Sequence, residues 1–179
     1  FDLDMLHEYV HLKQKYLLSS EYNNPFINWG DLVLAEDIAG VATDWYVNAE
    51  IVKLCKDEAF EKLKHDFKSI KNQFSSDCTD SQYLIAGLTF AEAKRWLNYN
   101  DWPKDEKLKK IINAISNTDP CLPCAKSINN LIVDLINTLG HVKAELKKDD
   151  EGQYISVEGV ELDVVESDNR KDDLLERFF

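Results

Sequence analysis

Two histidines four residues apart, with a glutamate beside the first, constrain this chain more than any other feature of its sequence. They form the pattern His7-Glu8-x-x-His11, and because neither proline nor glycine occurs before Asn24, we predict a helix over residues 2–18. Side chains four residues apart lie on one face of a helix. The two imidazoles would therefore point to a common site, an arrangement that tetrahedral zinc accepts, with Glu8 able to reach a metal-bound water.

A helix with this pattern is typical of metal-assisted hydrolysis in which the glutamate is the general base. The alternative is an amphipathic surface helix whose histidines are solvated or cap a neighbouring element. Two further histidines occur in the chain. We expect His65, between a lysine and an aspartate, to be exposed, and His141 to be packed or solvated rather than a ligand.

A zinc hydrolase needs a third protein ligand and leaves the fourth position to water. The next helix, predicted over residues 32–55, places Asp37, Asp44 and Asn48 on one face, interleaved with small residues that let another helix approach. Buried carboxylates are normally paired or bound to metal. We therefore predict Asp44 as the third ligand, supported by Asn48 one turn later, with Glu36 and Asp37 as reserve ligands.

These two segments resemble the metallopeptidase-like domain found beside von Willebrand A-type domains in bacteria and phages. Its pattern is HExxH followed by roughly N-I-A-A-D-x-x-V-N, and the likeness covers about residues 5 to 50, with extra residues before Asp44. The resemblance implies a mainly helical, zincin-like domain that acts on peptide bonds. It also implies that His7, His11 and Asp44 bind one catalytic zinc and that Glu8 is catalytic.

Zincin-type peptidases place a sheet before the HExxH helix, and the edge strand of that sheet aligns the substrate. Only six residues precede His7. We expect either that upstream sequence completes the sheet or that the domain has lost its substrate platform. The second possibility favours a catalytically inactive metal-binding scaffold within a larger assembly. For an active enzyme the oxyanion stabiliser is open, with Tyr22, Tyr46 and His65 as candidates.

The chain of 179 residues is long enough for one substantial core. A net charge of −12 argues against nucleic-acid binding, and no apolar run is long enough for a membrane span. Nothing at the start of the sequence resembles a signal peptide, so we expect a cytoplasmic protein.

Residues 149–179 hold eleven acidic against three basic side chains, a net charge of −8. This tail suggests a third alternative, an acidic inhibitor or assembly factor that binds a protein partner through it.

The four cysteines leave three interpretations open. Cys121-Leu-Pro-Cys124 is half of a structural zinc site, a redox pair, or a pair of free thiols, and a complete site would need Cys55 and Cys78 to converge on it. A fully reduced chain fits a cytoplasmic protein.

The remaining pattern predicts a mainly α-helical fold with a small C-terminal β-hairpin. Apolar residues alternate with polar ones around Glu158-Gly159, which is typical of a hairpin. We divide the chain into a helical domain, residues 1–148, and a hairpin with an acidic tail, residues 149–179, packed on the same domain. Further helices are predicted over residues 57–73, 80–99, 103–116, 124–148 and 172–179.

Overall fold

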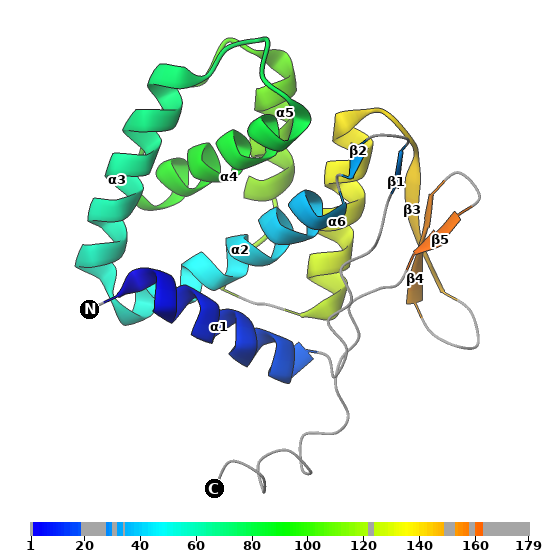
Figure 1. The fold of residues 1–179 in the computed structure, drawn as a ribbon, viewed down its shortest axis with the longest axis horizontal. Coiled ribbons are helices and arrows are strands. Elements are labelled where there is room, and N and C mark those ends of the chain that lie inside the picture. Colours follow the sequence, from blue (N-terminus) through cyan, green and yellow to red (C-terminus); the bar gives the residue numbers. More distant parts are fainter. Residues whose placement is uncertain are drawn as a thin grey trace, which may run out of the picture.

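The computed structural model describes residues 2–18, 28–29, 32–33, 35–121, 124–148, 153–157 and 160–162. The elements follow in the order α1 (Leu3–Leu18), β1 (Asn28–Trp29), β2 (Leu32–Val33), α2 (Ala35–Leu54), α3 (Lys56–Gln73), α4 (Asp80–Trp96), α5 (Glu106–Ser116), α6 (Ala125–Leu139), β3 (Ala144–Lys148), β4 (Gln153–Val157) and β5 (Val160–Leu162). The predicted class, mainly helical with a small C-terminal β element, is confirmed. The C-terminal sheet and α3 lie on opposite sides of the molecule, with α6 between them (Figure 1).

The main core forms around α4, which begins with a capping box. The Thr79 hydroxyl accepts from the backbone of Gln82, and the Gln82 side chain accepts from the backbone of Thr79, so two donors at the helix start are satisfied. The apolar face of α5 packs against α4, and the apolar face of α6 packs against α5 and α2, because their branched residues recur at helical period. The fully buried members are Leu108, Ile111, Ile112 and Ile115 of α5 and Ile128, Leu131, Ile132, Leu135 and Ile136 of α6.

The helix α1 packs through a smaller apolar cluster of its own. Val10 contacts Val47 and Ile51 of α2, and Leu3 and Leu6 lie beside them. A second link joins Lys13 of α1 to Glu50 of α2, with 3.1 Å between the ammonium and the carboxylate. The position of α1 on α2 is therefore set by few residues, and this pair of helices carries the candidate site.

The C-terminal sheet contains one strand more than the predicted hairpin. Strands β4 and β5 form that hairpin, with Val157 opposite Val160, and the residues between them lie outside the described part of the chain. The helix predicted over 124–148 is wrong in its last third, because α6 ends at Leu139 and β3 pairs antiparallel with β4. Gly140 ends α6 in the left-handed region with φ 78°, where a side chain would be strained.

Other element boundaries differ for local reasons. Helix α2 begins three residues later than predicted, because residues 32–33 pair with residues 28–29 as short strands. Helix α5 begins at Glu106 rather than at Pro103, because the Asp105 carboxylate accepts from the backbone of Leu108 and caps it. The predicted cap at Asp31 lies outside the described residues.

Two other expectations concern the C-terminal part. The predicted helix over 172–179 and most of the acidic tail lie outside the described residues. The sheet itself crosses the boundary predicted at residue 148, because β3 precedes it and β4 and β5 follow it. Among the helices of the described ranges, none has the length and apolar content needed to cross a membrane.

Candidate metal centre

The two histidines of the HExxH pattern lie next to each other on α1, as their spacing predicts. Their ring centroids are 4.6 Å apart, with the rings edge to face. His7 and His11 keep about a quarter of their side-chain surface exposed, 27% and 25%. Val10 lies in the small apolar cluster on α2, and this packing turns the histidine face of α1 toward α2.

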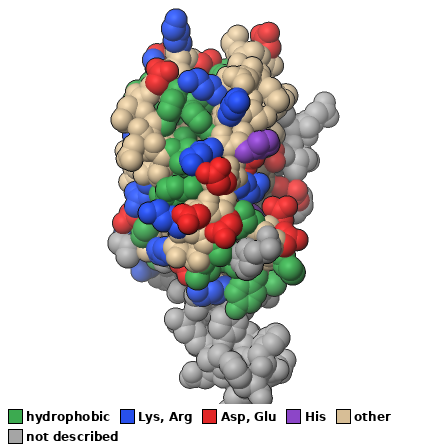
Figure 2. All heavy atoms as spheres, turned by 90° about the vertical axis from the view of Figure 1, so that its left-hand side faces the viewer, with side chains coloured by type: hydrophobic (Ala, Val, Ile, Leu, Met, Phe, Trp, Pro, Cys, Tyr) green, Lys and Arg blue, Asp and Glu red, His purple; other side chains and the backbone are tan. Residues whose placement is uncertain are grey.

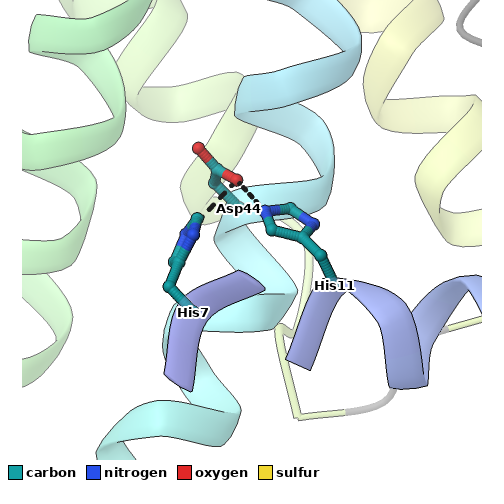
Figure 3. A group of neighbouring side chains, drawn as sticks. All are labelled: His7, His11 and Asp44. Carbon is teal, nitrogen blue, oxygen red and sulfur yellow. Dashed lines mark ion pairs between the residues drawn. The ribbon is translucent and has the colours of Figure 1, made fainter. Parts of the chain in front are cut away.

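Asp44 of α2 completes the group. Its Oδ1 atom lies 2.8 Å from Nε2 of His11 and 3.5 Å from Nε2 of His7 (Figure 3). Asp44 lies one turn before Val47, which packs against Val10, so the same apolar contact aligns the carboxylate with the imidazoles. The side chain of Asp44 is 30% exposed, which leaves the group open on one side.

These three side chains provide a donor set that suits zinc. One ligand atom from each of His7, His11 and Asp44 lies within 4.8 Å of the others, and in the described part of the chain no other such group of three exists. Two imidazole nitrogens and one carboxylate oxygen are ligands that zinc accepts in catalytic sites. The tertiary structure therefore brings the predicted third ligand to the predicted pair.

Glu8 takes a different place from the three donors. Its Oε1 atom lies 3.7 Å from Nδ1 of His7, the nitrogen on the far side of the ring from Asp44, and its side chain is 77% exposed. A carboxylate beside the second nitrogen of a ligand histidine fixes the orientation of that ring. At 3.7 Å Glu8 is beyond hydrogen-bond distance of His7, and as an exposed side chain it is free to adopt other rotamers.

Asn48 does not support Asp44 in the way the sequence suggests. Its amide nitrogen donates instead to Oε1 of Glu92 on α4, over 2.6 Å. Glu92 is only 7% exposed, and burial, opposed by the Asn48 hydrogen bond, raises its pKa to about 8. Our sequence prediction missed Glu92; the signal was an acidic residue within the apolar register of α4.

The reserve ligands lie elsewhere. Asp37 accepts a hydrogen bond from the Ser81 hydroxyl at the start of α4, and Glu36 is exposed at the start of α2. Neither belongs to the group formed around Asp44. Both are two turns earlier on α2, too far along the helix to share one ion with residues aligned on Asp44.

The suggested oxyanion stabilisers gain no support from the structure. Tyr46 is buried, with its hydroxyl near Thr118 and Ser127, and burial raises its pKa. Two residues after Asp44, it lies on the other side of α2. His65 is 85% exposed on α3 beside Asp66, as the sequence predicts, and Tyr22 lies outside the described residues.

All four cysteines are free thiols, and none belongs to a metal-ligating group among the described residues. Cys124 caps α6, where a hydrogen bond with Ser127 lowers the pKa of its thiol despite partial burial. Cys121 lies 3.8 Å from the guanidinium of Arg95. The cysteine pair therefore has separate local partners in this structure and does not form a second metal site in the described part.

The sequence was compared with protein-family models and with curated proteins, and the fold was compared with solved structures. None of these comparisons gives a match. The chemistry of the chain is therefore inferred from the two imidazoles of α1 and the carboxylate of α2 that face each other.

Proposed function

We propose that this chain is a zinc-dependent, metallopeptidase-like hydrolase, with Glu8 as its general base. The observation that carries the proposal is the convergence of His7, His11 and Asp44 within 4.8 Å. Metal sites need such preformed sets of donors, and a third donor from a separate helix does not follow from the HExxH spacing alone. The likeness to metallopeptidase-like domains supports a peptide or protein substrate.

Each residue has a role that its position supports. Zinc held by the three side chains would supply Lewis-acid polarisation of a carbonyl and an activated water. Glu8 would accept the proton of the attacking water on its carboxylate and later return it to the leaving amine. Its 77% exposure leaves room for the rotation that this requires. The four free thiols support a reducing, cytoplasmic setting.

A second candidate function is a metal-binding scaffold without catalysis. The position of Glu8 favours it, because its carboxylate lies on the Nδ1 side of His7, away from Asp44, and reaches a base position only by a rotamer change. In this case the ion would hold α1 on α2 and serve stability alone.

Metal analysis tests the site itself. Purified protein loaded with zinc and dialysed should retain about one ion per chain. The variants His7→Ala and Asp44→Ala should retain almost none, because each removes a ligand. His65→Ala is the matched control, since that imidazole is 85% exposed on α3. Equal zinc retention in all four proteins would disprove the metal centre.

Turnover separates the two functions. The zinc-loaded protein is incubated with a mixture of unstructured peptides, and new termini are counted by mass spectrometry. Glu8→Gln should retain zinc but lose cleavage by about a hundredfold or more, because it removes a general base. Glu61→Gln, an exposed change of the same kind on α3, should cleave as the wild type does. If the wild type binds zinc and cleaves nothing, the scaffold function stands.

A further inference from the structure

A cavity of about 280 Å³ begins at His7 and extends between four helices. It is bounded by α1, α2, α3 and α4, and much of its wall is apolar. The apolar lining residues are Leu3, Ile51, Val52, Ala59, Leu63, Leu88 and Trp96. Since His7 is both a candidate zinc ligand and a wall residue, whatever fills the cavity lies next to the proposed reaction centre.

The charges in the wall are mostly negative. Asp4, Asp66 and Glu92 contribute carboxyl groups, and Lys62 contributes the one cation of the lining. The Lys62 ammonium lies 3.1 Å from Oδ2 of Asp66, so its charge is already paired. The face around α3 in Figure 2 carries such mixed charges, with basic and acidic side chains intermingled. In the cavity wall, by contrast, Asp4 and Glu92 form no ion pair with a described residue.

Glu92 is the most deeply placed of these acids. It is 7% exposed, and among the described residues its hydrogen-bond partner is the Asn48 amide. A buried carboxyl group beside a cavity is costly unless it has a partner, and it is a frequent mark of a functional site. Burial raises the pKa of Glu92 to about 8, and a cation placed beside it would favour the carboxylate.

We propose that this cavity is the specificity pocket of the hydrolase and that it receives a lysine side chain of the substrate, with Glu92 facing the ammonium. The role as a specificity pocket rests on the proposed function, whereas binding of a lysine side chain does not require the metal. The methylene groups of a lysine match the apolar wall, for example Leu63 and Leu88, and the buried Glu92 of the same wall offers the ammonium a partner. An apolar side chain would make the same contacts with the apolar wall but would offer Glu92 no polar partner.

Binding of two small probes tests the pocket without any turnover. N-acetyl-lysine amide and N-acetyl-norleucine amide have side chains of similar length and differ in the terminal ammonium. The probes are titrated into the ¹⁵N-labelled full chain at pH 8 with EDTA present, where a Glu92 carboxyl of pKa about 8 is readily ionised. The lysine probe should bind about tenfold more tightly, the effect of one hydrogen bond with a charged group. The backbone amide signals of Leu63 and Leu88 should shift, which places the probe in the cavity.

The variant Glu92→Gln should remove this preference, because its amide cannot balance the ammonium charge. It still accepts the Asn48 hydrogen bond, so the fold should be retained. Glu61→Gln, exposed on α3 and outside the cavity wall, should keep the preference. Tighter binding of the norleucine probe, or an unchanged preference in Glu92→Gln, would overturn the proposal. So would signal shifts confined to residues outside the cavity, and that result serves as the check if Glu92→Gln fails to fold.

The probes also separate this inference from the proposed function. His7→Ala should lose zinc but still prefer the lysine probe, since Glu92 and the apolar wall remain. Lysine preference in a protein that neither binds zinc nor cleaves peptides would refute the hydrolase and leave a basic-side-chain pocket. A zinc-dependent peptidase without lysine preference would refute the pocket alone.

Discussion

The Asp44 carboxylate lies between two imidazoles because of the apolar residues around it. On α2 it is three residues before Val47, and on α1 the two histidines flank Val10, so one apolar contact aligns all three polar groups. The side chains of His7, His11 and Asp44 are between one quarter and one third exposed, so solvent reaches the group. A half-buried group with one open side is what a catalytic metal needs.

Glu92, by contrast, is buried, and this position disfavours the charged form of its carboxyl group. Burial raises its pKa from 4.5 to about 8, and the Asn48 hydrogen bond offsets only part of this effect. Between these two values the folded chain keeps a proton that the unfolded chain releases. Raising the pH through this range therefore favours the unfolded state.

We expect this effect to appear in the pH dependence of stability. The free energy of unfolding should lose up to about 1.4 kcal/mol per pH unit through Glu92 as the pH rises from about 4.5 to about 8. Glu92→Gln removes this contribution. The free energy of unfolding of the variant should therefore rise relative to that of the wild type as the pH increases. Urea denaturation in EDTA at several pH values measures it, with Glu61→Gln as the exposed control. Parallel curves for wild type and Glu92→Gln would contradict the burial of an ionisable group.

At the scale of elements, α4 and α5 approach so closely that one position on α4 has no room for a side chain. A Cβ atom at Gly87 would lie 2.3 Å from Cγ2 of Ile111, which is fully buried on α5 and cannot move aside. Gly40 of α2 differs, because a Cβ atom there would meet nothing within 4 Å. The small residues beside Asp44 are therefore not all required by close packing, contrary to the sequence argument.

Alanine substitution at the two glycines should have opposite effects. Gly87→Ala should destabilise the fold by about 1–3 kcal/mol, because it overpacks the interface between α4 and α5. Gly40→Ala should stabilise it by about 0.5–1 kcal/mol, because alanine loses less conformational freedom in a helix. Chemical denaturation of the two variants measures both changes. Equal destabilisation by both would show that α2 packs more tightly at Gly40 than the structure indicates.

At the scale of the whole molecule, the parts are joined by a few polar contacts around one core. Asp80, at the first turn of α4, pairs with Lys107 of α5 and with His141 beyond the end of α6. Burial acts to raise the pKa of Asp80, but these two partners outweigh it and lower the pKa. The helix α1 is held on α2 by its small apolar cluster, by the pair of Lys13 and Glu50, and by the contacts of His7 and His11 with Asp44.

Zinc should therefore stabilise the molecule by fixing α1 on α2. Binding at one hundred times the dissociation constant adds about 2.7 kcal/mol, which for a chain of this length raises the melting temperature by about 5–10 °C. Calorimetry with zinc and with EDTA measures the difference. His11→Ala should melt at one temperature in both conditions, while His65→Ala should behave as the wild type does. Zinc-independent melting of the wild type would contradict a role of the ion in holding α1.

The sequence by itself determined the features that depend on local periodicity. The HExxH helix, the apolar faces of α5 and α6 and the hairpin of β4 and β5 follow from the spacing of residues close together in the chain. The pairing of His7 and His11 belongs here too, because residues four apart on a helix are neighbours whatever surrounds them. The same spacing argument predicts Asp44 as the third ligand, because of the face that it occupies on α2.

The tertiary structure alone decided which distant residues meet. It brought Asp44 rather than Glu36 or Asp37 to the histidines, because the rotation of α1 on α2 is set by apolar contacts between segments separated by a long connection. It also turned Asn48 toward Glu92, formed the cavity between four helices, and made β3 a strand. Such outcomes depend on packing between elements, for which no local period in the sequence provides a signal.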